Sequence, residues 1–168
     1  MIFGRPGSGK STFAKELHNN TGINLYHLDR YFYVENWVER NTGEFLQIQQ
    51  SLVNQDRWIV DGNSIRTLGL RYAHAEVALY FNYPRWLCLY RLFKRRFFKN
   101  LAIQDRATGC AEVIQWKLIT YMWRFANRVD GQIKDLQQQY PNVKFVEIRN
   151  KRDLELVWQS LSPVATTL

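Results

Sequence analysis

The sequence has little cysteine, few prolines and no long apolar run, and each shortage excludes a class of protein. Its two cysteines, Cys88 and Cys110, have no metal-ligand spacing, so we interpret them as packing thiols and expect a reducing, cytoplasmic location. No apolar run approaches the ~18 residues of a membrane span, and no signal-peptide core precedes a small-residue cleavage site, so no membrane partner is expected. Without repeats or a Pro-rich linker, residues 1–168 are predicted to form a single domain.

Acidic residues are scarce in one part of the chain. Residues 85–134 contain 11 lysines and arginines but only three acidic residues, whereas the rest of the chain has 12 of each sign. One segment therefore produces the whole formal net charge of +8, which indicates a focused anion site. The anion is a nucleotide phosphate, a nucleic acid or an acidic lipid surface, and charge alone does not choose among them.

Short apolar runs alternate with helical patterns along the chain. Strands are expected at 1–3, 23–27, 58–60, 76–81 and 143–148, and helices at 10–19, 43–56, from 85 onward, 112–136 and 153–161. Strands that alternate with helices predict right-handed crossovers and a mainly parallel sheet that is covered on both faces. We therefore predict an α/β fold with three layers (α/β/α) and five strands. Residues 99–109 lack periodicity and are interpreted as a mobile loop.

The segment Gly4 to Ser11 reads G-R-P-G-S-G-K-S and fits the phosphate-loop pattern G-x-x-x-x-G-K-[ST]. Glycines let backbone N–H groups surround phosphate oxygens, and a helix beginning near Lys10 adds the positive end of its dipole. Lys10 is expected to reach the β- and γ-phosphates of a nucleotide, and the Ser11 hydroxyl to ligate Mg2+. The predicted nucleotide-binding residues are Gly4, Arg5, Pro6, Gly7, Ser8, Gly9, Lys10, Ser11 and Thr12.

The alternative for this segment is an ordinary glycine turn before a helix, but a strand before and a helix after are the context that the motif requires. The three residues before Gly4 are few for a strand that feeds such a loop, since strands average about five or six residues. Either this strand is truncated or residues upstream are missing from the sequence.

Two aspartates follow predicted strands. Asp61 can hold Mg2+ directly or through water; the alternative is a turn-forming role, which the pair with Gly62 favours locally. Asp29 lies beyond the second strand, where parallel sheets bind ligands, so we expect it to accept the proton of a substrate hydroxyl or to hold the metal. The alternative for Asp29 is a helix cap or an ion pair with Arg30. His27 is interpreted as a structural histidine.

Together these motifs carry a family resemblance. The phosphate loop, Asp61-Gly62, and the arginines Arg91, Arg95 and Arg96 resemble nucleoside monophosphate kinases such as adenylate kinase, in which an arginine helix leads into a lid over ATP. Almost the whole chain is similar to the related family of DNA topology modulation proteins, through segments 26–29, 55–63, 84–88 and 123–125. The resemblance implies a P-loop kinase fold with strand order 2-3-1-4-5, a small helical lid around 94–112, and ATP with Mg2+ as cofactors.

Arg91 and Arg95 lie one helical turn apart and share a face, and their planar guanidinium groups suit phosphate oxygens. With Lys10 and Asp29 they are the predicted catalytic residues; the alternative for the arginines is a solvated basic face. The chain departs from adenylate kinase at residues 63–67, which replace the aromatic-Pro-Arg step that holds the AMP phosphate, and this argues against AMP as the acceptor.

The leading hypothesis is a kinase that transfers the γ-phosphate of Mg-ATP to a small-molecule or nucleotide acceptor. No N-K-x-D stretch is present, which argues against a GTPase. The second hypothesis is a nucleic-acid-binding protein that uses residues 85–134 and has a regulatory or vestigial ATP site. Trp86, Trp116 and Trp123 can stack on unpaired bases, but their positions within apolar helical faces favour core packing. The sequence leaves open the acceptor and whether the protein is a monomer or dimer.

Overall fold

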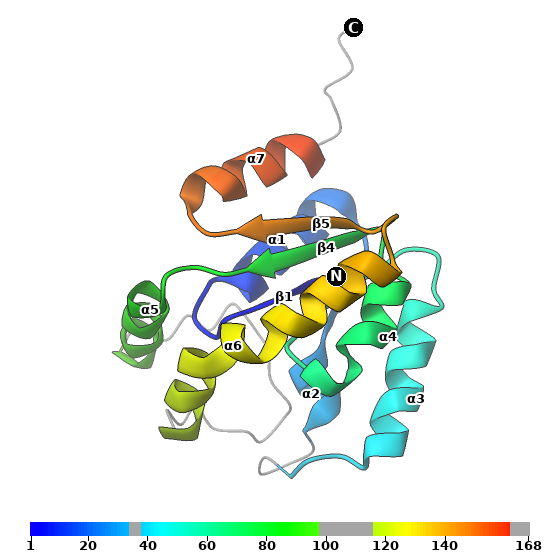
Figure 1. Ribbon diagram of the computed structural model, residues 1–168, viewed down its shortest axis with the longest axis horizontal. Helices are drawn as coiled ribbons and strands as arrows, with labels where there is room; N and C mark the ends of the chain where they lie inside the picture. The colour runs from blue at the N-terminus through cyan, green and yellow to red at the C-terminus, as the bar shows by residue number, and fades with distance from the viewer. Residues whose placement is uncertain (34–37, 98–115, 162–168) are drawn as a thin grey trace, which may run out of the picture.

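The computed structural model describes the backbone of residues 1–33, 38–97 and 116–161, and their side chains except those of 95–97 and 116–118 (Figure 1). The loop predicted at 99–109, and most of the lid expected around 94–112, lie outside these residues. Among the helices that are described, none is long and apolar enough to cross a membrane.

The described residues form one sheet of five parallel strands (Figure 1). The strands are β1 (Ile2–Gly4), β2 (Leu25–His27), β3 (Ile59–Asp61), β4 (Val77–Phe81) and β5 (Lys144–Ile148). Their order across the sheet is β2-β3-β1-β4-β5. The α/β class, the five strands and the strand order are therefore confirmed.

Helices connect these strands in the order that the alternating pattern predicts. They are α1 (Lys10–Thr21), α2 (Leu28–Phe32), α3 (Thr42–Val53), the 3-10 helix η2 (Ile65–Thr67), α4 (Leu68–Ala73), α5 (Arg85–Phe97), α6 (Trp116–Gln139) and α7 (Lys151–Leu161). The sequence predicts α1, α3, α5, α6 and α7 to within a few residues at the described ends, but not α2, η2 or α4.

Both faces of the sheet are buried under helices. On one face, α1 and α7 pack together over the strands, and the rings of Phe13 and Trp158 lie 4.7 Å apart. On the other face, α4 and α6 cover the stacked rings of Phe3 and Tyr80, whose centroids are 5.1 Å apart, and Phe125 of α6 is fully buried there. The sheet thus lies between two helical layers, and its carboxyl-terminal edge carries the loops that follow β1, β2 and β3.

Two tryptophans, one on α5 and one on α6, are exposed and not packed in the core as the sequence predicts. Trp86 on α5 is 69% exposed and Trp123 on α6 is 48% exposed, so the expected core packing of these two side chains is wrong. The residues that α5 buries are Cys88 and Leu92, which lie on the opposite side of the helix from Trp86. The side chain of Trp116 lies outside the described residues.

Candidate functional site

The glycine-rich loop lies at the centre of the sheet, between β1 and α1. Gly4, Gly7 and Gly9 have φ angles of 144°, 80° and 94°, which residues other than glycine rarely adopt. A Cβ atom on Gly4 would collide with the backbone of Phe81, and one on Gly7 would collide with the carbonyl group of Cys88. Strand β4 and helix α5 therefore press directly on the loop and fix its shape.

Helix α1 begins at Lys10 without a side-chain cap from the described residues. Its N-cap residue is Gly9, and its first turn contains no acidic residue. The first N–H groups of a helix have no partner within the helix, and the helix dipole adds positive potential at the same point. This end of α1, with Lys10 and Ser11 in its first turn, is therefore suited to hold a phosphate group.

Asp61 ends β3 and is buried beside this helix terminus. Burial alone would raise the pKa of its carboxyl group, but the hydrogen bond with His27, the charge of Lys10 and the Ser11 hydroxyl together lower that pKa below its usual value. Asp61 is therefore ionised at neutral pH. The three residues predicted for phosphate and metal binding, Lys10, Ser11 and Asp61, act on one another in the structure.

One oxygen of Asp61 has unused bonding capacity. Oδ1 is buried and accepts no hydrogen bond of good geometry from the described residues, although the Ser11 hydroxyl is near enough to stabilise the negative charge. Mg2+ prefers oxygen ligands and is commonly held by one or two carboxylates together with substrate phosphates. An orphaned carboxylate oxygen near a serine hydroxyl fits this requirement, so Ser11 and Asp61 are the residues that would hold the ion.

His27 holds the other oxygen of Asp61. In the β2–β3 pairing His27 lies directly opposite Asp61, and its Nδ1 is 2.9 Å from Oδ2. The side chains are 11% and 4% exposed, so this contact is shielded from water. Because an ionised carboxylate only accepts hydrogen bonds, Nδ1 must carry the hydrogen. His27, which the sequence analysis interprets as a structural histidine, is thus hydrogen-bonded to the candidate metal ligand Asp61.

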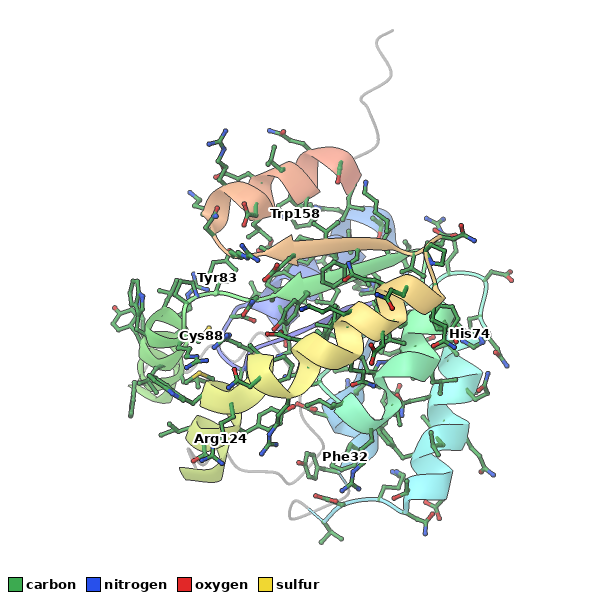
Figure 2. The ribbon with its side chains drawn as sticks, in the orientation of Figure 1. Phe32, His74, Tyr83, Cys88, Arg124 and Trp158 are labelled. Carbon is green, nitrogen blue, oxygen red and sulfur yellow. The ribbon has the colours of Figure 1, made fainter. Side chains whose placement is uncertain are left out.

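Of the two predicted catalytic arginines, Arg91 reaches the loop. Its Nη1 donates a 2.9 Å hydrogen bond to the carbonyl oxygen of Ser8, and its guanidinium lies 4.9 Å from the ring centre of Tyr83. Tyr83 lies in the connection between β4 and α5 (Figure 2). Arg91 therefore supports the loop and places a cation beside it. The side chain of Arg95 lies outside the described residues.

Asp29 is exposed in the first turn of α2, immediately after β2. Burial raises the pKa of the Tyr121 hydroxyl on α6, and the charge of Asp29 raises it further, so the two side chains are near each other. Asp29 therefore lies near α6, at the same edge of the sheet as the glycine-rich loop. The predicted helix-cap alternative does not hold for α2, whose N-cap residue is His27.

The turn after Asp61 contains a residue that sequence reasoning did not assign. Asn63 Oδ1 accepts a 2.9 Å hydrogen bond from the backbone N–H of Gly4, and the Tyr121 hydroxyl donates to the Asn63 carbonyl at 3.4 Å. One residue further on, buried Arg71 donates to the Ser64 carbonyl at 3.0 Å. The turn is therefore fixed to the phosphate loop, to α4 and to α6. An asparagine directly after Asp61-Gly62 was the only local signal.

Arg5 connects the loop to β5. Its side chain is buried, and its Nε donates a 2.9 Å hydrogen bond to Asn82, which in turn donates to Glu147 at 2.7 Å. Arg149 donates to the other oxygen of Glu147 at 2.7 Å. The predicted nucleotide-binding residue Arg5 is thus part of a polar row that leads to the segment after β5.

Taken together, the site joins a positive helix terminus and two cations to a buried, ionised carboxylate. Neither a scan against protein-family models nor a search of curated proteins finds a match for this chain. Such an arrangement can bind the phosphates of a nucleotide and a divalent cation side by side.

Proposed function

We propose that the chain is an ATP-dependent phosphotransferase with a P-loop kinase fold, related to nucleoside monophosphate kinases and to the DNA topology modulation proteins that it resembles. The observation that carries this proposal is the convergence of Lys10, Ser11 and buried Asp61 at the glycine-rich loop. An ordinary glycine turn before a helix would not need a buried carboxylate with a free oxygen beside the first helical turn.

Phosphoryl transfer depends on positioning and on neutralising charge, more than on covalent chemistry of the protein. The N–H groups of the loop and of α1 would bind the β-phosphate, and Lys10 would place its charge at the β- and γ-phosphates. Mg2+ held by Ser11 and Asp61 would neutralise further charge on these oxygens. Arg91 is beside the loop and would exchange part of its contact with Ser8 for the transferred group.

The acceptor is proposed to be a small molecule or nucleotide that approaches from the β2 side of the loop. Asp29 is exposed at that side and near Tyr121, so a substrate hydroxyl there would have a carboxylate to accept its proton. A proton acceptor of this kind typically contributes 10² to 10⁴-fold to the rate. Arg66, which lies in the segment 63–67 that replaces the aromatic-Pro-Arg step of adenylate kinase, is exposed on η2.

The test is ADP release from Mg-ATP with a panel of nucleotides, nucleosides and hydroxylated metabolites. Lys10→Ala should reduce turnover by roughly 10² to 10³-fold, the usual effect of removing one transition-state contact. Lys144→Ala is the matched control, because Lys144 is exposed at the amino-terminal end of β5, far along the sheet from the loop. Equal rates for both variants and the unmodified chain would remove the loop from the mechanism.

A second candidate function is a nucleic-acid-binding protein with a regulatory or vestigial ATP site. The exposure of Trp86 and Trp123 favours this function, because rings that are not packed in the core are accessible for stacking on bases. Lys10→Ala distinguishes the two functions, because it should reduce phosphoryl transfer as stated above but leave nucleic-acid binding unchanged.

A further inference from the structure

Helix α5 has two opposite apolar faces, and only one of them is packed. Cys88 and Leu92 are buried toward the glycine-rich loop, whereas Trp86, Tyr90 and Phe93 are 69%, 59% and 46% exposed. The spacing i, i+4, i+7 places the three exposed rings in a single stripe along the outer side of the helix. Along the helix axis, the residues of this stripe are separated by about 6 Å (Trp86 to Tyr90) and about 4.5 Å (Tyr90 to Phe93).

Trp123 of α6 adds a fourth exposed ring next to this stripe. Helices α5 and α6 are in contact, and the guanidinium of Arg85 lies 5.3 Å from the ring centre of Trp123. We call the four exposed rings, Trp86, Tyr90, Phe93 and Trp123, the aromatic face. Exposed large hydrophobic side chains on α5 and α6 are all aromatic among the described residues, since the exposed aliphatic ones belong to other parts of the chain.

Within the described residues of α5 and of α6 before Asp130, the charged side chains have one sign. Helix α5 carries five lysines and arginines and no acidic residue, and the first acidic residue of α6 is Asp130. Lys94 and Arg124 are exposed, and Arg124 lies on the part of α6 toward α5 (Figure 2). Charge complementarity therefore favours an anionic partner for this face. The same charge opposes pairing of this face with a second copy of itself.

We propose that the aromatic face binds single-stranded nucleic acid. Proteins that bind single strands combine cations for the phosphates with aromatic rings on which successive bases stack. The exposed rings along α5 supply the stacking surface, and Arg85, Lys94 and Arg124 supply the cations. An anionic lipid surface is the other partner of this chemistry, since helices at membrane interfaces also carry Trp and Phe beside Lys and Arg, and the vesicle measurement below separates the two.

The aromatic face is separate from the phosphate loop, although α5 contacts that loop with its inner side. Arg91 and Cys88 contact the loop from the inner side of α5, whereas the aromatic face lies on its outer side. The binding of a nucleic-acid strand therefore does not depend on a nucleotide in the loop. A failure of the proposed phosphotransferase activity would leave this inference unaffected, and the reverse also holds.

The experiment measures binding of fluorescein-labelled oligothymidylate, longer than the ~4–16 nucleotides that such proteins typically occupy, by fluorescence anisotropy. Trp86→Ala and Tyr90→Ala are each expected to weaken binding roughly 5- to 150-fold, the equivalent of losing one stacked base. Leu156→Ala on α7 is the matched control, because Leu156 is 56% exposed at a distant surface, and its affinity should equal that of the unmodified chain. Circular dichroism verifies that all three variants are folded.

A salt titration separates the cationic part of the interaction. Lys94→Ala should weaken binding and reduce the slope of log affinity against log salt by about 0.7, the value for one phosphate contact on a single strand. Three results would each overturn the inference: affinities of Trp86→Ala and Leu156→Ala that are equal, duplex DNA that binds as tightly as the single strand, or vesicles of phosphatidylglycerol that bind when the oligonucleotide does not.

Discussion

The contact between His27 and Asp61 is the part of the site whose strength can be predicted most directly. Replacing His27 by alanine removes the only hydrogen bond that the described residues provide to the carboxylate of Asp61 with good geometry. The carboxylate then remains buried, with Lys10 and the Ser11 hydroxyl as its remaining stabilising groups. The perturbation therefore tests whether Asp61 is held in place by its neighbour on β2.

The expected magnitude follows from the geometry of this contact. A 2.9 Å hydrogen bond to a charged group contributes about 1.5–3 kcal/mol to the free energy of unfolding. Breaking a buried ion pair costs about 3–5 kcal/mol, but Lys10 still compensates Asp61 here, so the lower range applies. We therefore expect a coupling free energy of about 1.5–3 kcal/mol between the two side chains.

The assay is a double-mutant cycle of His27→Ala, Asp61→Ala and the double variant, with urea unfolding followed by circular dichroism. Because the pKa of Asp61 is lower in the folded chain than its usual value, its stabilising contribution is present above about pH 3.9 and is lost as the pH falls through the folded pKa. The coupling measured at neutral pH should therefore decline in acid. Effects that add to within about 0.5 kcal/mol at neutral pH would refute the reasoning.

Two other predictions test the packing around the loop. Gly22→Ala, at a φ of 68° with no atom nearby, should lower the free energy of unfolding in chemical denaturation by about 1–2 kcal/mol. Gly7→Ala, at a φ of 80° and against the Cys88 carbonyl, should lower it by about 1–3 kcal/mol more. Equal losses for the two variants would show that α5 does not pack against the loop. Burial raises the pKa of the Cys88 thiol, so alkylation followed by peptide mapping should find Cys88 unmodified in the folded chain and modified in urea. Modification at the same rate in both states would contradict the packed position of α5.

The strands and the long helices could be predicted because their signals are local. The apolar run that becomes β4 and the glycine pattern before α1 each lie within a short window of sequence. Helix α4 has no such signal, since Gly69 lies inside it and glycine disfavours a helix by about 1 kcal/mol. In the structure, a Cβ on Gly69 would lie 3.6 Å from Leu136 of α6, so packing of α6 against this segment supports a helix that local preference does not favour.

The exposed tryptophans could not be predicted for a different reason. Apolar periodicity in α5 defines two faces, one with Cys88 and Leu92 and one with Trp86 and Tyr90, and nothing in the local pattern says which face is buried. The buried face is selected by the loop, whose Gly7 allows the backbone of α5 to approach closely. Periodicity alone therefore does not determine which of the two faces of α5 is buried.

The contacts that assemble the site are all distant in sequence. His27 and Asp61 are 34 residues apart, Gly4 and Asn63 are 59 apart, and Ser8 and Arg91 are 83 apart. A motif within a few residues can therefore identify the phosphate loop but not the groups that hold it. The pairing of His27 with Asp61 nevertheless follows once the strand order is known, because β2 and β3 are neighbours and these residues end them in register. Strand order thus carries information about the site that neither strand contains alone.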